Sequence, residues 1–242
     1  MQMANKITDR KFWQDYWRGY QPKLITTILF QDIFASFPSG NQTFIEIGGF
    51  PGNFSIYFRK FKKYQVTMLD YFVDYQIISQ ALKINSLDQN AIRIIEVDFF
   101  DFQSDKQYDI VFSAGFIEHF DNPEIVVKKH LELLKPGGLL FISLPNFLGL
   151  NGFVQKIFDK KNLTRHNTEI MKIEKLNALF NAMDLTNYKI SYWGKPSIWL
   201  ESSSGRSKSL IKAIKAISKI LNLLNLKNKF LSPYLVVQAY KK

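Results

Sequence analysis

Cysteine is absent from this chain of 242 residues. Disulfides, thiolate zinc sites and a cysteine nucleophile are therefore excluded. The first six residues lack the apolar segment of a secretory signal peptide. No uninterrupted apolar run of about 18 residues occurs, so we expect no membrane-spanning helix. From these absences we predict a cytoplasmic location.

Acidic residues are also few, since 21 aspartates and glutamates are set against 32 lysines and arginines and give a formal net charge of +11. Such an excess indicates either a solvated lysine-rich surface or an anionic partner, such as nucleic acid, anionic lipid or a phosphate-bearing substrate. Over most of the chain we interpret it as a solvated surface, because excess charge by itself serves solubility.

One segment near the C-terminus is the exception. Residues 207–226 have the period of an amphipathic helix, with lysines on one face and aliphatic side chains on the other. The lysines are Lys208, Lys212, Lys215 and Lys219, and the aliphatic residues are Leu210, Ile211, Ile214, Ile217, Leu221 and Leu224. This pattern is typical of a helix that lies on an anionic membrane surface. A surface helix packed on a sheet, or a lid over a cavity, remains an open alternative.

The chain alternates between apolar segments of strand length and amphipathic segments of helix length. The expected strands are 43–47, 65–70, 92–97, 108–112, 139–143, 188–193 and 234–240. The expected helices are 5–20, 24–37, 53–63, 74–85, 123–134, 169–183 and 207–226. Near-continuous apolar strands alternating with helices favour a parallel sheet covered on both faces. We therefore predict an α/β, Rossmann-like, doubly wound and mostly parallel seven-stranded sheet, with a ligand beyond the carboxyl ends of its strands.

A glycine-rich turn joins the first expected strand to the next helix. Glu46 precedes Gly48, Gly49 and Gly52. Glycines allow a sharp turn and a close approach of backbone to ligand, and the following helix presents its N-terminal amides there. Such turns are common, so this feature alone is also compatible with a tight strand–helix connection.

Two further carboxylates end the next strands. Asp70 closes the second strand, where a carboxylate can accept hydrogen bonds from both hydroxyls of a ribose. Asp98 follows the third strand and has Phe99 beside it, a pairing that suits an adenine amine and the face of the base. Acids at three successive strand ends together predict a nucleoside site.

At this point the chain resembles the class I S-adenosylmethionine-dependent methyltransferases, specifically the small-molecule branch that includes ubiquinone-biosynthesis-type enzymes and the methyltransferase types 11, 12 and 23. The resembling motifs, in the family's order, are residues 46–52, Asp70, 97–99, 108–113, 117–120 and 134–138. The aromatic segment 12–17 also resembles the family's cofactor-covering helix.

The resemblance implies roles for individual residues. The implied contacts to S-adenosylmethionine come from Glu46, Gly48, Gly49, Gly52, Asp70, Tyr71, Asp98, Phe99, Ser113, Ala114 and Gly115. The family usually has glycine at the position of Phe50, so that ring must point away from the cofactor. We expect Gly49 to supply the missing backbone freedom one residue earlier. The expected product is S-adenosylhomocysteine.

The same resemblance predicts a single domain over residues 1–242. Residues 1–40 form its helical cap and residues 41–146 its cofactor-binding core. Residues 147–242 provide substrate-side elements and complete the sheet, with the amphipathic helix inserted before the last strand.

Methyl transfer needs a base only where the acceptor retains a proton. His119 and His166 are the candidate bases, because histidine titrates near neutral pH, although each is also compatible with a packing role. Tyr16, Asn146 and Arg165 are the candidate substrate contacts. We expect no metal, because no paired His, Asp or Glu spacing of the usual kind occurs.

These features predict methyl transfer to a small-molecule, sugar- or lipid-linked acceptor, preferably at oxygen. A nicotinamide-dependent oxidoreductase is disfavoured because Phe50 stands where its G-x-G-x-x-G fingerprint, counted from Gly48, needs the second glycine. A nucleic-acid methyltransferase is disfavoured because residues 113–116 lack the motif of amino-directed enzymes, and no RNA-binding module is visible. A non-catalytic partner protein with this fold stays open, as does the oligomeric state.

Overall fold

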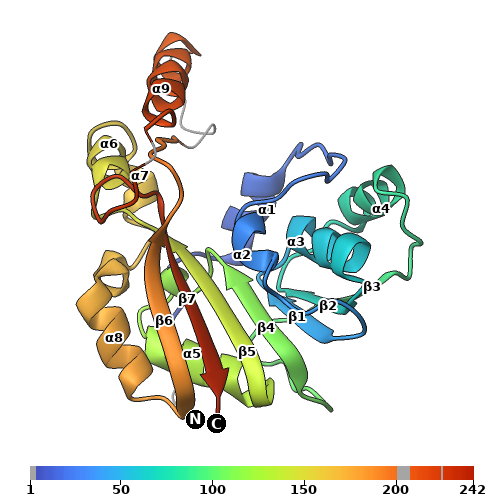
Figure 1. Cartoon of the computed structure of the whole chain (residues 1–242). Coiled ribbons are helices and arrows are strands. Elements are labelled where there is room, and N and C mark those ends of the chain that lie inside the picture. Colours follow the sequence, from blue (N-terminus) through green and yellow to red (C-terminus); the bar gives the residue numbers. More distant parts are fainter. Residues whose placement is uncertain (1–3, 201–207, 225) are drawn as a thin grey trace. The chain divides into compact units, whose positions relative to one another are not determined.

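The computed structural model describes residues 4–200, 208–224 and 226–242. Within these ranges the strands form one seven-stranded sheet in the order β3-β2-β1-β4-β5-β7-β6 (Figure 1). The strands are β1 (Thr43–Ile47), β2 (Gln65–Asp70), β3 (Ile92–Glu96), β4 (Tyr108–Ala114), β5 (Leu134–Pro145), β6 (Leu185–Trp193) and β7 (Tyr234–Lys241). β1 pairs in parallel with β2 and with β4, and β2 pairs in parallel with β3. The predicted fold class is confirmed.

The helices follow most of the expected ranges. They are α1 (Arg10–Trp17), α2 (Gln31–Phe34), α3 (Asn53–Tyr57) with the π-helical turn η1 (Phe58–Lys62), α4 (Tyr75–Ile84), α5 (Pro123–Glu132), α6 (Leu150–Phe158), α7 (Lys160–Leu163), α8 (Ile173–Asn181) and α9 (Lys208–Leu221), with 3-10 turns η2 (Ile117–His119) and η3 (Thr168–Met171). Residues 207 and 225 of the expected amphipathic helix, and 201–205 of the preceding Ser-rich stretch, lie outside the described residues. No described helix has the length and apolar character needed to cross a membrane.

The expected helix over residues 24–37 was wrong, since only α2 forms there. The side chain of Asn85 explains the difference. Its Oδ1 accepts a hydrogen bond from the Ile25 amide at 2.7 Å, and its Nδ2 donates to the Lys23 carbonyl at 3.0 Å. These tertiary bonds satisfy the backbone of the segment before α2 and so remove its need for helical partners.

The sheet reverses its strand order beside β1. From β1 the chain builds β2 and β3 on one side, and β4 lies on the other. In an open α/β sheet, ligands bind outside the carboxyl ends of the strands at such a switch point. The fold therefore directs attention to the residues that follow β1, β2, β3 and β4.

The chain divides into two compact units. The glycine-loop unit comprises Thr8–Ala114, Val127–Phe141 and Tyr240–Lys242, and the histidine unit comprises Met1–Ile7, Gly115–Val126 and Ile142–Ala239. Both take residues from separate parts of the chain, so neither coincides with the segments expected from the sequence. The single-domain organisation stays a prediction.

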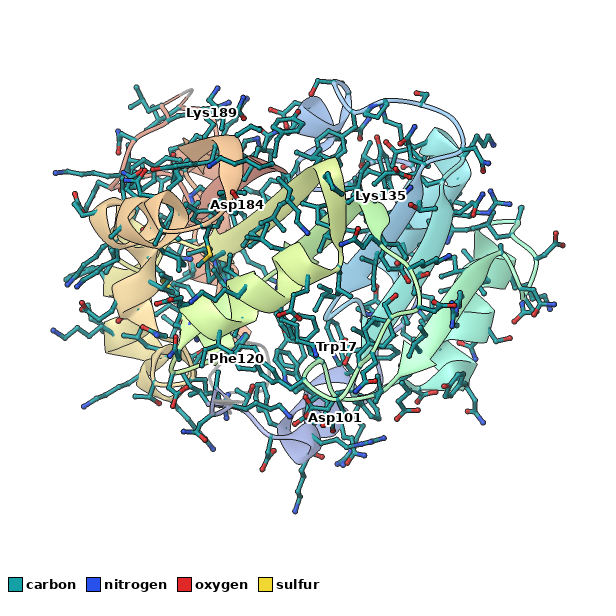
Figure 2. All side chains as sticks on the ribbon, turned by 90° about the horizontal axis from the view of Figure 1, so that it is seen from below. Trp17, Asp101, Phe120, Lys135, Asp184 and Lys189 are labelled. Atoms are coloured by element: carbon teal, nitrogen blue, oxygen red, sulfur yellow. The ribbon has the colours of Figure 1, made fainter. Side chains whose placement is uncertain are left out.

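Phenylalanine dominates the core of the glycine-loop unit. Phe34, Phe44, Phe58, Phe112 and Phe141 are completely buried. The rings of Phe112 and Phe141 stack with centroids 5.0 Å apart, which joins β4 to β5. Full burial of one such side chain contributes roughly 1.5–3 kcal/mol to stability. At the other end of β4, Lys135 (Figure 2) donates to Asp109, with 2.7 Å between Nζ and Oδ1.

Candidate cofactor site and a histidine–glutamate cluster

The carboxyl ends of β1, β2 and β3 lie side by side in the glycine-loop unit. In the parallel register, Ile47 is opposite Leu69 and Asp70 is opposite Glu96. The Val97 amide then donates to the Asp70 carbonyl at 2.9 Å. The glycine loop, Asp70 and the turn that begins at Asp98 therefore follow three neighbouring strands at one edge of the sheet.

Glu46 connects β1 to the start of α3. Its side chain is 3% exposed, and Oε2 accepts hydrogen bonds from the Ser55 amide at 2.8 Å and the Ser55 hydroxyl at 2.5 Å. Burial raises the pKa of Glu46 to about 8, although the bonds from Ser55 oppose that shift. The observed role of Glu46 is to hold the loop against the first turn of α3.

The three glycines of the loop meet two different requirements. Gly48 and Gly52 have φ angles of 68° and 89°, in the region that favours glycine. Gly49 does not, so the expectation that it supplies the backbone freedom was wrong. Gly49 is needed for space, because a Cβ there would lie 2.6 Å from Cγ of Met68 and 3.0 Å from Cγ of Glu46.

Asp70, at the end of β2, is hydrogen-bonded to the glycine loop that follows β1. Its Oδ2 accepts from the Phe50 amide at 2.9 Å, and its Oδ1 accepts from the Phe72 amide at 3.1 Å. Burial raises the pKa of Asp70 to about 6, against hydrogen bonds from the backbone of Phe50, Phe72 and Tyr71 that lower it, and this value still lies below pH 7. A carboxylate has about four acceptor positions, so both oxygens keep capacity for ribose hydroxyls. The predicted contact Tyr71 lies between Asp70 and Phe72 in the chain and is partly buried.

The ring of Phe50 packs within the protein. It is 4% exposed and contacts Trp17 edge-on at a centroid distance of 5.7 Å, as well as Phe72 at 5.5 Å. The amide of Phe50 still faces Asp70. A bulky residue is thus accommodated in place of the usual glycine by the aromatic side chains around it.

Helix α1 carries the expected aromatic stripe and is anchored at the carboxyl ends of the strands, beside the end of β3. Arg10 forms an ion pair with Glu96 at the end of β3, and beyond α1 the Tyr20 hydroxyl donates to Asn53 Oδ1 at 3.2 Å. No residue of α1 is buried, and Tyr16 is 37% exposed and contacts Trp17. An aromatic helix with an open face beside the glycine loop is suited to cover a ligand.

The side chains of Phe99 and Ser113 converge on a residue that the sequence analysis missed. Phe99 is buried and contacts the His130 ring at a centroid distance of 5.0 Å, while Ser113 Oγ lies 3.1 Å from His130 Nε2. Asp98 accepts from the Phe100 amide at 3.0 Å. The Ser113 hydroxyl therefore faces His130, and the backbone of Ser113 and Ala114 is what remains at the carboxyl end of β4. The periodicity of α5 was the one signal that could have placed His130 on its inner face.

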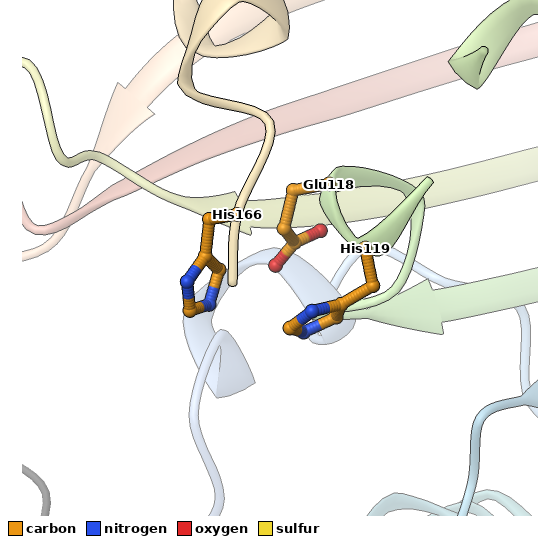
Figure 3. Close-up of side chains that lie close together, drawn as sticks. All are labelled: Glu118, His119 and His166. Carbon is orange, nitrogen blue, oxygen red and sulfur yellow. The ribbon is translucent and has the colours of Figure 1, made fainter. Parts of the chain in front are cut away.

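The two candidate bases lie together in the histidine unit (Figure 3). His119 belongs to η2 and His166 follows α7, and their ring centroids are 4.6 Å apart. Glu118 lies with them, and one possible ligand atom from each of the three residues falls within 4.8 Å of the others. Nothing in the sequence spacing connects Glu118 to the distant His166, and only the fold brings them together.

Burial weakens both histidines as proton acceptors. It lowers the pKa of His119 to about 3, with the nearby His166 adding to the shift, and that of His166 to about 4. Both rings are therefore neutral at pH 7. A general base works best when its pKa is near the operating pH, so a catalytic role for either histidine stays a prediction that this environment disfavours.

The remaining predicted contacts in the histidine unit are bonded to the chain itself. Asn146 is buried, and its Nδ2 donates to the carbonyls of Lys229 and Ser232, both at 2.8 Å, while its Oδ1 accepts from the Leu148 amide at 3.2 Å. Its observed role is to hold the loop before β7. Arg165 is partly buried and its carbonyl lies 3.0 Å from His119 Nδ1. Gly115 has a φ angle of 69°, and its amide donates to the Ser143 carbonyl at 2.8 Å.

Known proteins share both sequence and fold with this chain. The mitochondrial ubiquinone biosynthesis O-methyltransferase of Dictyostelium discoideum is 29% identical over 35% of this chain, a match that spans only 28% of that protein. A SAM-dependent methyltransferase from Archaeoglobus fulgidus has a TM-score of 0.57 at 17% identity, covering 88% of this chain and 91% of the other. Phosphoethanolamine N-methyltransferase 2 of Haemonchus contortus, solved with S-adenosylhomocysteine, has a TM-score of 0.60 at 12% identity, covering 88% and 51%.

A family model described as a methyltransferase domain matches residues 16–191, which include the glycine loop, Asp70, Asp98 and the histidine cluster. The structural likeness agrees with this match, because the strand order and the position of the glycine loop are those expected for the predicted fold. The chain therefore belongs to the methyltransferase domain family and has the fold of S-adenosylmethionine-dependent methyltransferases.

Proposed function

We propose that this protein transfers the methyl group of S-adenosylmethionine to an oxygen of a small-molecule or lipid-linked acceptor. The observation that carries the proposal is the placement of Asp70, whose carboxylate accepts a hydrogen bond from the glycine loop at the switch point of the sheet. Family membership supports the reaction class. The oxygen preference is supported by the ubiquinone biosynthesis relative, whose match spans a minor part of both chains.

Methyl transfer mainly requires that the acceptor oxygen, the methyl carbon and the sulfur lie in line. The acceptor oxygen forms a bond to the methyl carbon while the carbon–sulfur bond breaks, so the sulfonium loses its charge and S-adenosylhomocysteine leaves. The acceptor proton passes to solvent or to a base. The protein must bind the cofactor, orient it and exclude water. In this assignment Asp70 binds the ribose, Asp98 binds the adenine amine, and the glycine loop faces the methionine moiety under α1.

Transfer of a labelled methyl group tests this proposal. Purified protein is incubated with methyl-tritiated S-adenosylmethionine and with small-molecule and lipid extracts, and the products are separated and hydrolysed. We expect label in one extract fraction, either as a methyl ether that survives hydrolysis or as a methyl ester that releases labelled methanol, and none with the Asp70→Ala variant. Cofactor binding without transfer to any fraction would contradict the catalytic role and favour a partner protein.

We also propose that α9 and the residues after it contact an anionic membrane surface. Ile214 is buried and anchors the helix, whereas Ile217, Ile220 and Leu223 are 51%, 67% and 81% exposed. Lys215 and Lys219 are exposed on the same helix. Lysines beside solvent-exposed aliphatic side chains suit the boundary between anionic headgroups and acyl chains.

Helix α6 adds exposed apolar side chains in the same unit. Phe153 and Ile157 are 61% and 55% exposed. Two neighbouring residues bond to the two helices. The Ile198 amide donates to Ser218 Oγ of α9 at 2.9 Å, and the Trp199 carbonyl accepts from Gln155 Nε2 of α6 at 2.8 Å. Large exposed apolar patches mark interaction sites in soluble domains. This surface favours a lipid-linked acceptor, and the cytoplasmic location stays a prediction.

Liposome co-sedimentation tests the membrane contact. Replacing both Ile217 and Ile220 by aspartate should at least halve the fraction bound to vesicles of phosphatidylserine and phosphatidylcholine. The change removes exposed apolar area that the proposal buries in the membrane, and it adds charge that anionic headgroups repel. Ile84→Asp is the matched control, because Ile84 is also an exposed helical isoleucine, at the end of α4, and should leave binding unchanged. Wild-type protein that fails to sediment with these vesicles would refute the contact.

A further inference from the structure

Glu118 is in an unusual position for a carboxyl group. The residue is completely buried. The backbone of Phe116 and of Glu118 itself lies near the carboxyl group, yet neither carboxyl oxygen has a hydrogen-bond partner of normal geometry among the described residues. A buried, unsatisfied polar atom costs about 1–3 kcal/mol, more for a charged one. Such an atom in a native structure calls for an explanation, and an ion that satisfies it is one.

The two histidines beside Glu118 are oriented as metal ligands usually are. His119 Nδ1 lies 3.0 Å from the Arg165 carbonyl, and His166 Nδ1 lies 2.9 Å from the Asn162 carbonyl. A carbonyl oxygen only accepts, so each Nδ1 carries the proton and each Nε2 carries the lone pair. Metal-bound histidines almost always donate their second ring nitrogen to a carbonyl or carboxylate in this manner.

The three side chains can converge on one ion. One ligand atom from each of Glu118, His119 and His166 falls within 4.8 Å of the others, and Figure 3 shows the carboxyl group turned into the space between the two rings. His119 and Glu118 are adjacent in η2, so a single short turn supplies two of the three donors.

We propose that Glu118, His119 and His166 bind one divalent transition-metal ion. Two imidazoles and one carboxylate favour zinc, cobalt or manganese over calcium and magnesium, which prefer oxygen donors. Three protein ligands leave coordination positions for water or another small ligand. The proposal rests on the geometry of this chain alone. It is independent of the methyl-transfer proposal.

Metal content after reconstitution tests this site. The chelator-treated protein is incubated separately with Zn²⁺, Mn²⁺ and Co²⁺, desalted and analysed by mass spectrometry for metal per chain. Wild-type protein should retain about one ion of at least one of these metals, and Co²⁺ should give visible absorption bands. Glu118→Gln and His166→Ala should weaken binding by at least about tenfold, since loss even of an outer partner costs that much.

His130→Gln is the matched control. His130 is the remaining histidine, is fully buried, and belongs to the glycine-loop unit, so its loss should leave metal content unchanged. Glu118→Gln preserves the shape of the side chain, and circular dichroism checks that each variant folds. Wild-type protein that retains none of the three metals would overturn the proposal, as would folded Glu118→Gln and His166→Ala variants that bind as well as wild type.

Discussion

Replacing Asp70 by alanine is expected to weaken S-adenosylmethionine binding by at least about a hundredfold. A hydrogen bond to a charged group contributes about 1.5–3 kcal/mol, and Asp70 is proposed to accept one from each ribose hydroxyl. A loss of about 3 kcal/mol corresponds to roughly a hundredfold in dissociation constant. The substitution also removes the acceptor for the amides of Phe50 and Phe72, which loosens the loop. Isothermal titration calorimetry measures the effect.

Two further variants separate ribose binding from loop support. Asp70→Asn keeps one acceptor oxygen and should bind with intermediate affinity. Asp101→Ala removes an exposed carboxylate shortly after Asp98 and should bind as wild type does. An Asp70→Ala variant that is folded and keeps wild-type affinity would remove Asp70 from the cofactor site.

Replacing Gly49 by alanine should both destabilise the protein and impair cofactor binding. The added Cβ would lie 2.6 Å from Met68 Cγ and 3.0 Å from Glu46 Cγ, and neither atom is the far end of a flexible side chain. Forcing extra volume into a packed site costs typically about 1–3 kcal/mol. Thermal unfolding should therefore begin at lower temperature, and cofactor affinity should fall because the loop shifts relative to Asp70.

A double-mutant cycle with Met68→Ala shows whether space is the cause. The second substitution removes the closer of the two clashing atoms, so the double variant should lose less stability than the sum of the single losses. Strict additivity of the two losses would contradict the steric explanation. An unchanged melting temperature in Gly49→Ala alone would do the same.

The sequence predicted those features that depend on local pattern. Apolar strands alternating with amphipathic helices predicted the sheet, and the acids at Asp70 and Asp98 were placed at strand ends, which the register reproduces. The second N-terminal helix was wrong because Asn85, remote in the sequence, binds the backbone at Lys23 and Ile25. Local propensity carries no information about such a partner.

In the candidate sites, too, the features set by local sequence were predicted and those set by tertiary contacts were not. Gly48 and Gly52 were recognised from the turn itself, whereas the need for glycine at position 49 depends on Met68 in the neighbouring strand. The Glu118, His119 and His166 cluster could not be found from spacing, because His166 reaches it only through the fold. Asn146 had suggested a substrate contact by its place after β5, yet its amide holds the loop before β7.

Calorimetric titration of the wild-type protein with S-adenosylmethionine tests the central claim most directly, with a nicotinamide dinucleotide as the comparison ligand. One molecule of S-adenosylmethionine should bind per chain, S-adenosylhomocysteine should compete with it, and the dinucleotide should give no binding heat. Binding of the dinucleotide in place of both adenosyl compounds, or no binding of any of the three, would contradict the account.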